Sequence, residues 1–185
     1  NRGLTIDPTS QALNDLVVIL PYLRGDVDAW YALHPEHKIE ERDLAPWYLL
    51  HKGQLDLAQK VIDDRIKQTP ELDDLLMQRA LLMALKGNFH DADAQAENAL
   101  AKVPHNNESY HHQTYVIACI KAIEGNSDDA VKWLRETANT GYPDYPLFAK
   151  DPFLDRIRQS PEFIQFLAEQ KAQHDRFQRE FGEEQ

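Results

Sequence analysis

Apolar residues recur at helical spacing along much of the chain. In residues 75–85 and 92–100 they fall at i, i+3, i+4 and i+7, the spacing that places them on one face of an α-helix. The sequence has no alternating Val/Ile/Thr runs bounded by Asn-Gly or Asp-Gly, which would indicate β-hairpins. The pattern therefore predicts an all-α protein.

Two segments 34 residues apart share a Lys-Gly pair, an alanine five residues after the glycine, and a closing proline. The glycine suits the left-handed conformation that ends a helix, and the proline cannot continue one. The small alanine lets the next helix approach closely. The two segments are residues 52–70, with Gly53, Ala58 and Pro70, and residues 86–104, with Gly87, Ala92 and Pro104.

A third unit keeps the same spacing at Gly125 and Ala130 but lies 38 residues after the second. Four residues are therefore inserted in the preceding helix or turn, and the closing proline is displaced to Pro143. Pro46 falls inside the first helix of the first unit, so we expect that helix to begin late or to kink. The sequence predicts three helix pairs, over residues 39–72, 73–106 and about 107–144. An N-terminal helical segment, residues 1–38, precedes them, and it could itself be a degenerate repeat.

A 34-residue helix–turn–helix with this glycine, alanine and proline spacing resembles the tetratricopeptide repeat. The resemblance implies an α-α superhelix of stacked antiparallel helix pairs. Residues 141–170 are similar to the closing segment of tetratricopeptide domains in bacterial multidomain signalling proteins. This implies a scaffold for protein binding that serves as the regulatory or docking part of a larger signalling protein. Residues 145–185 are then a loop and a C-terminal capping helix, whose apolar face would carry Phe163, Phe166, Leu167, Phe177 and Phe181.

The resemblance also implies a binding groove lined by the first helix of each pair. Its surface would be apolar with acids at one rim, which suits an apolar helix or a non-acidic peptide. The Lys/Asn/Arg set with which chaperone-binding members clamp a carboxylate is absent. The predicted groove residues are Glu40, Asp43, Trp47, Leu50 and His51 in the first unit, Asp74, Met77, Leu81, Ala84 and Leu85 in the second, and His112, Tyr115, Cys119, Ala122 and Ile123 in the third.

A different interpretation is a structural or dimerisation domain with no free ligand. Residues 115–123 are apolar nearly all round, as in a buried helix. The groove could then be filled by residues 1–34 or by the C-terminal helix, or it could form a homodimer contact. Tyr142 and Tyr145 present the same choice, because they either pack their loop onto the last repeat or grip a ligand.

Charge and composition limit the classes of molecule that we expect this chain to bind. The chain has 20 Lys and Arg residues against 31 acids, a net charge of −11, and no basic cluster. We therefore expect a protein or peptide partner and no nucleic acid. No apolar run is long enough to cross a bilayer. The chain begins at Asn1 without an initiator Met, so we interpret it as a piece of a longer protein or as a processed form. The sequence leaves the compartment open, with the cytoplasm favoured.

The candidates for chemistry are few. The paired histidines, His34 with His37 and His111 with His112, lack a supporting carboxylate pattern, so no metal site is expected. Cys119 lies in an apolar helix, where a thiol has a raised pKa and acts as a small hydrophobic group. The sequence shows no phosphate-binding glycine loop and no catalytic triad, and it predicts neither enzymatic activity nor a cofactor.

Overall fold

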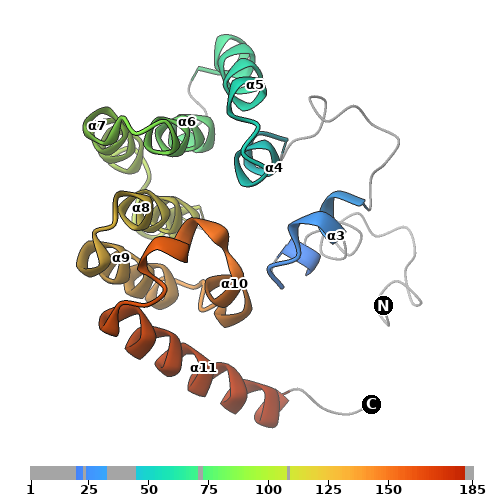
Figure 1. The fold of residues 1–185 in the computed structure, drawn as a ribbon, viewed down its shortest axis with the longest axis vertical. Helices are drawn as coiled ribbons and strands as arrows, with labels where there is room; N and C mark the ends of the chain where they lie inside the picture. Colours follow the sequence, from blue (N-terminus) through green and yellow to red (C-terminus); the bar gives the residue numbers. More distant parts are fainter. Residues whose placement is uncertain (1–19, 23, 33–44, 71–72, 108, 182–185) are drawn as a thin grey trace.

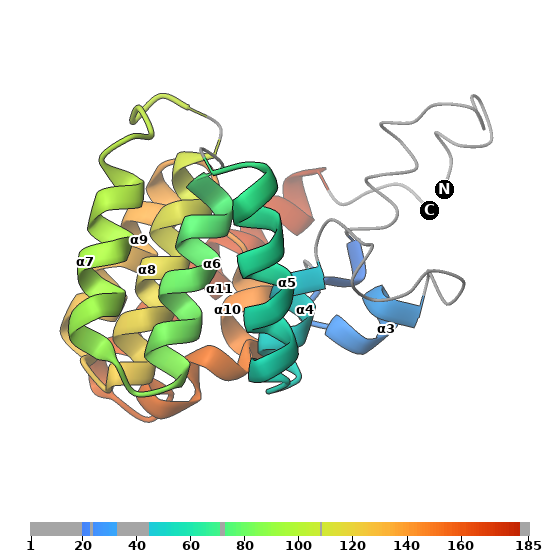
Figure 2. The ribbon, with the colours of Figure 1, turned by 90° about the horizontal axis from the view of Figure 1, so that it is seen from above.

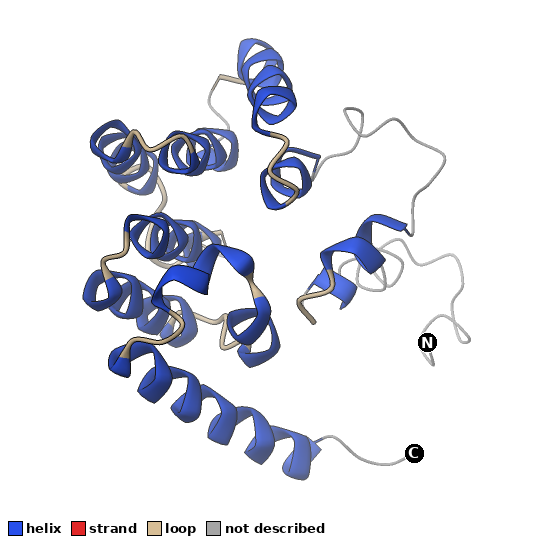
Figure 3. Ribbon diagram, viewed as in Figure 1, coloured by secondary structure: helices blue, strands red, loops and turns tan. Residues whose placement is uncertain are grey.

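The computed structural model describes residues 20–22, 24–32, 45–70, 73–107 and 109–181. Across these residues the chain forms helices and turns, and no strand (Figure 3). The all-α prediction is confirmed. The helices are α3 (Val27–Ala32), α4 (Ala45–His51), α5 (Leu55–Gln68), α6 (Asp73–Leu85), α7 (Phe89–Leu100), α8 (Tyr110–Glu124), α9 (Ser127–Asn139), α10 (Tyr145–Lys150), the short 3-10 helix η2 (Pro152–Ile157) and α11 (Pro161–Phe181).

Helices α4 to α9 form three successive pairs (Figure 1). Within each pair the second helix packs back against the first, and α6 in turn contacts both α5 and α8. Seen from above, the axes of α6, α7 and α8 run side by side (Figure 2). Because every pair buries its apolar side against a neighbour, the core extends continuously through the described array.

The three turns inside the pairs have the same backbone geometry. Gly53, Gly87 and Gly125 have φ of +66°, +82° and +93°. At the second turn the Gly87 N–H donates to the Ala84 carbonyl, and the Asn88 N–H donates to the Met83 carbonyl, both at 2.9 Å. The first and third turns repeat this pair of bonds. It is the Schellman arrangement, which satisfies carbonyls at a helix end and favours glycine at the left-handed position.

The alanines of the repeat pattern lie where close approach was predicted. Ala58, Ala92 and Ala130 are fully buried in α5, α7 and α9. Pro46 lies in the first turn of α4, where a missing N–H breaks no helical bond. The insertion before the third unit lies in a connection, because residues 101–109 precede α8 whereas only 69–72 precede α6.

The C-terminal segment covers the last pair. Helix η2 packs on α8, and α11 packs on α9 and α10 (Figure 1). Phe163 and Phe166 are fully buried, as expected for a capping helix. Phe177, further along α11, is 38% exposed, so the packed face ends before it. At the other end, α3 lies beside α4.

Candidate functional site

A cavity of about 350 Å³ lies where the first helices of the three pairs face one another. Trp47 reaches it from α4, three residues from α6, and four from α8. Two more residues come from the N-terminal side and one from the turn after α9. The lining residues are Tyr22, Trp30, Trp47, Asp74, Met77, Gln78, His112, Gln113, Tyr115, Val116 and Tyr142.

Helical spacing explains why these side chains meet. On α6, Asp74, Met77 and Gln78 are three and four residues apart, so they share one face. On α8, His112, Tyr115 and Val116 repeat that spacing. Each first helix therefore directs one stripe toward the cavity and its remaining apolar positions toward the core.

Aromatic rings form most of the wall. The Tyr22 ring lies 6.2 Å from both Trp30 and Trp47, measured between ring centroids. Trp47 lies 6.5 Å from Tyr115, which in turn lies 6.2 Å from Tyr142. Most of these pairs are edge-to-face or tilted, the arrangements that aromatic quadrupoles prefer. The rings are large and rigid, and they hold the helices apart at this point.

Polar atoms without a partner are concentrated in the same residues. Among the residues that the structure describes, four buried side-chain atoms lack a hydrogen bond, and three of them belong to the cavity lining. They are Trp30 Nε1, Gln78 Oε1 and Gln113 Oε1. The Gln113 amide donates through Nε2 to Asp74 Oδ1 at 2.5 Å. Because a carboxylate accepts only, this bond sets the amide orientation and leaves Oε1 as the unpaired end.

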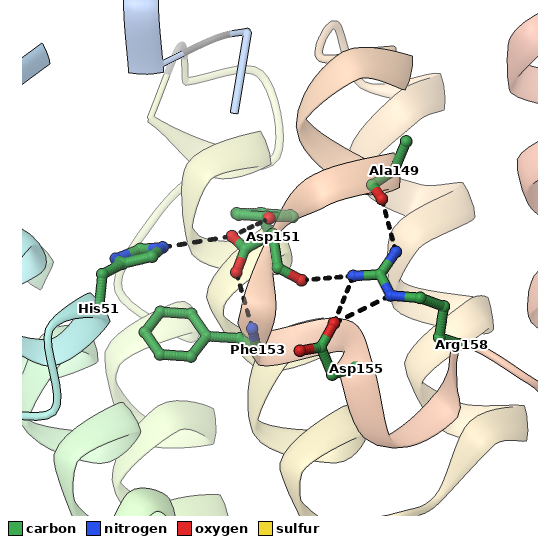
Figure 4. Close-up of polar contacts among 7 residues, drawn as sticks. His51, Ala149, Asp151, Phe153, Asp155 and Arg158 are labelled. Carbon is green, nitrogen blue, oxygen red and sulfur yellow. Dashed lines mark hydrogen bonds and ion pairs between the residues drawn. The ribbon is translucent and has the colours of Figure 1, made fainter. Parts of the chain in front are cut away.

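A buried carboxylate lies behind the cavity wall (Figure 4). The Asp151 side chain is fully buried, and its Oδ2 accepts a hydrogen bond of 2.5 Å from the Tyr115 hydroxyl. His51 Nε2 lies 3.4 Å from the same oxygen, and the Phe153 N–H donates to Oδ1 at 2.8 Å. The His51 ring is held in turn by the Trp47 carbonyl, 2.9 Å from Nδ1. The carboxylate thus connects two cavity-lining aromatics, Trp47 through His51 and Tyr115 directly, to η2.

Arg158 supports the backbone around Asp151 without neutralising its carboxylate. Its guanidinium donates to the main-chain carbonyls of Ala149 and Asp151, at 2.6 and 2.8 Å, and to the Asp155 carboxylate (Figure 4). The described hydrogen-bond donors to the Asp151 carboxylate itself are a hydroxyl and a backbone N–H, with the His51 ring nearby. A buried carboxylate needs such donors to offset its lost hydration.

The electrostatics of the wall follow from this burial. Loss of hydration raises the pKa of Tyr22, Tyr115 and Tyr142, and the negative charge of Asp151 raises the pKa of each further. Loss of hydration, helped by neighbouring His111, lowers the pKa of His112 to about 4. His112 is therefore neutral at neutral pH, and Asp74 has a formal charge at neutral pH among the lining residues that the structure describes.

The structure separates the predicted groove residues into two sets. Trp47, Asp74, Met77, His112 and Tyr115 line the cavity. Leu50, Leu81 and Cys119 do not, because they are buried in the core with no more than 1% of their surface exposed. These three side chains pack in the core and do not face the cavity.

The remaining predicted groove residues do not line the cavity or lie outside the described residues. His51 contacts Asp151 instead of the cavity, and Ala84 and Ala122 are buried. Leu85 and Ile123 are partly buried against the core and do not line the cavity. Glu40 and Asp43 lie outside the described residues, as do His34 and His37.

Several lining residues were not predicted. Gln78 and Gln113 each follow a predicted groove residue by one position, so a wider helical stripe would have included them. Tyr22 and Trp30 have no such signal, because they reach the cavity from a segment outside the repeats, and neither has Asp151, which lies behind the cavity wall. The Tyr142 ring stacks on His111 at 5.5 Å, so it packs its loop onto the last pair, and the same side chain also lines the cavity.

Other chemistry is limited in the described part of the chain. No cluster of three metal-ligating side chains occurs there. Cys119 is buried, and burial raises the pKa of its thiol well above the ordinary value, as predicted. No described helix is both long enough and apolar enough to span a bilayer. Comparison of the chain with protein-family models, curated proteins and solved structures gives no match.

Proposed function

We propose that this chain is a protein-interaction module of the tetratricopeptide type, which binds a peptide segment by seating one of its side chains in the aromatic cavity. The observation that carries the proposal is the cavity itself, lined from three successive helix pairs. Its aromatic walls with a few polar groups are typical of sites that bind a ligand. The repeat spacing supports the same assignment, because in that family the first helices face the partner.

In this proposal the module is the docking or regulatory part of a larger bacterial signalling protein. The similarity of residues 141–170 to the closing segment of such domains supports it. The partner is a protein or peptide, and neither a cofactor nor a metal is required for binding. The net charge of −11 disfavours nucleic acid.

A cavity-filling variant tests this function directly. We would select binders from a random-peptide display library on the wild-type chain and measure their affinity by calorimetry. Val116→Phe adds a ring to the cavity wall, so we expect it to weaken the selected peptides about tenfold or more. Ile164→Phe is the matched control, because Ile164 is 53% exposed on α11 and away from the cavity. Failure to select peptides, or equal binding by Val116→Phe, would refute the proposal.

One observation favours a second candidate, a structural domain with a self-filled groove. Tyr22 and Trp30, from the N-terminal segment, already cover one side of the cavity. Under this alternative the peptide selection fails and the chain has a fixed oligomeric state, which sedimentation equilibrium of wild type would reveal. A concentration-independent dimer without peptide binding would establish it.

A further inference from the structure

We propose that the partner segment carries aromatic side chains and binds by displacing a part of this chain that already occupies one side of the cavity. That part comprises residues 20–22 and 24–32, the cover segment. The inference rests on the proposed function, and it specifies the chemistry of the partner and the way in which it enters the site. It is carried by the rings that the cover segment places against α4 and by the weakness of its other attachments.

The cover segment contributes two buried rings to the site. Tyr22 and Trp30 are 8% and 6% exposed, and both line the cavity. The Tyr22 ring lies 6.2 Å from Trp47 and 6.1 Å from His51, edge-to-face in both pairs. The Trp30 ring lies 6.1 Å from Tyr48. Helix α4 therefore already binds aromatic side chains of another segment, although that segment belongs to the same chain.

The surface beneath the cover segment is itself aromatic. Trp47 and His51 are four residues apart on α4, so they share one face of the helix. Phe153 of η2 lies 5.7 Å from Trp47 and 4.1 Å from His51, measured between ring centroids. Ring pairs of this kind contribute more than the area that they bury. A tyrosine or tryptophan of a partner can repeat these contacts, whereas an aliphatic side chain loses the ring–ring part.

The polar contacts that tie the cover segment to the array are exposed. Lys52 Nζ lies 2.8 Å from Asp28 Oδ1, with 38% and 74% of the two side chains exposed. Lys150 Nζ donates to the Arg24 carbonyl at 2.8 Å, also at the surface. Exposed ion pairs contribute little to stability. Trp30 Nε1 is buried without a partner, which offsets part of the gain from burying the ring.

The secondary structure of the cover segment is short. Helix α3 has six residues, and an isolated helix of that length is not stable in water. The bound position of the segment therefore depends largely on its buried rings. A partner that supplies competing rings shifts the equilibrium toward release of the segment.

Gly25 offers a way to release the cover segment from outside the cavity. Its φ is +70°, and a Cβ at this position would lie 2.7 Å from Lys150 Cβ. Gly25→Ala should therefore push the turn away from α10. Arg24→Lys is the matched control, because it changes the exposed neighbouring side chain in the same turn.

Release is measured by hydrogen exchange of the Trp30 indole N–H in the nitrogen-labelled whole chain. We expect Gly25→Ala to lower the protection of this N–H about tenfold. The Ile120 amide, in the core of α8, should keep its protection, and Arg24→Lys should match wild type at both positions. Unchanged protection of the Trp30 indole in Gly25→Ala would refute a displaceable cover segment.

Two synthetic peptides test the chemistry of the partner. One copies residues 20–32, and the other carries Tyr22→Leu and Trp30→Leu in the same sequence. In calorimetry, we expect the first peptide to bind Gly25→Ala about tenfold more tightly than it binds wild type, because the competing segment is released. The leucine peptide should bind Gly25→Ala about tenfold more weakly than the first, because the ring–ring contacts are lost.

The outcomes separate the cover segment from the proposed function. If the leucine peptide binds as tightly as the first, or if neither peptide binds Gly25→Ala, an aromatic partner segment is refuted. Library-selected peptides that lose affinity in Val116→Phe, but bind Gly25→Ala and wild type equally, would uphold the proposed function and refute the cover segment as a competitor.

Discussion

The two sides of helix α8 are built differently, although both are buried. Toward α9 the packing is close: the Thr114 and Thr137 hydroxyls bond at 2.9 Å, and Ala130 and Leu134 are fully buried. Toward α4 and α6, the same helix presents Tyr115 and Val116 to a cavity of about 350 Å³. Small residues let helices meet, whereas large rigid rings prop them apart.

The two sides of α8 also differ in whether their buried polar atoms have hydrogen-bond partners. On the α9 side, Thr114 lies within reach of the His111 carbonyl and Thr137 of the Trp133 carbonyl; one hydroxyl donates to its carbonyl and the other donates across to its partner hydroxyl, so both buried hydroxyls are satisfied. On the cavity side, Gln78, Gln113 and Trp30 each keep an unpaired buried atom. Such an atom costs about 1–3 kcal/mol. We infer that the first side is built for stability, while the second gives up stability at the place where binding is proposed.

The largest effect should come from the buried Asp151 carboxylate behind the cavity wall. Asp151→Ala leaves the Tyr115 hydroxyl and the Phe153 N–H without their buried acceptor. We expect a loss of about 3–5 kcal/mol in the free energy of unfolding, measured by urea denaturation. Asp155→Asn is the control in the same segment, and its exposed pair with Arg158 is worth about 0–1 kcal/mol. Similar losses in both variants would contradict a central role for Asp151.

The next effect contrasts the two sides of α8 directly. Leu134→Ala, on the packed side, should destabilise the protein by about 2–5 kcal/mol because it creates a void among close-packed neighbours. Val116→Ala, in the cavity wall, should cost only about 1 kcal/mol because its neighbours already lack contacts there. Equal costs in urea denaturation would mean that the cavity wall is as tightly packed as the core.

Histidine titration gives a smaller, pH-dependent difference. His112 has a pKa of about 4 in the folded chain, below its ordinary value of 6.5, so the unfolded state binds more protons between these values. Its contribution to stability is therefore present above pH 6.5 and lost as the pH falls toward 4. We expect the melting temperature of His112→Gln to fall less than that of wild type over this range.

Two comparisons isolate that effect. Asp144, whose burial raises its pKa to about 6, changes stability in the opposite sense, since its contribution is lost as the pH rises. The informative quantity is therefore the difference between His112→Gln and wild type at each pH. His90→Gln, which removes an exposed imidazole, serves as the control for loss of a histidine as such. If the profiles of His112→Gln and wild type coincide, His112 is not held neutral by its surroundings.

The smallest expected effect is an increase in the free energy of unfolding. Gln78→Met keeps the length of the side chain and removes its unpaired carbonyl oxygen, so we expect stability to rise by about 1 kcal/mol. Gln178→Met, on the exposed part of α11, should leave stability unchanged. A destabilised Gln78→Met would show that the amide has a structural partner.

Local pattern in the sequence determined the helix pairs. The spacing of Gly53, Gly87 and Gly125, with a buried alanine five residues later, predicts turns and close contacts that the structure contains. The same helical spacing places Trp47, Met77 and Tyr115 on the faces that line the cavity. These features depend on residues within one or two helical turns of one another, so they can be recognised in a single sequence.

Only the tertiary structure decided how the site is closed. The Tyr115–Asp151 bond joins residues 36 apart, and the His51–Asp151 contact joins residues 100 apart. Tyr22 and Trp30 come from before the repeats, and Tyr142 comes from the turn after α9. Side-chain periodicity predicts which face of a helix is apolar. It does not predict the distance between the facing surfaces of two packed helices. That distance depends on the sizes of the residues that meet, so alanines closed one side of α8 while aromatic rings held the other open.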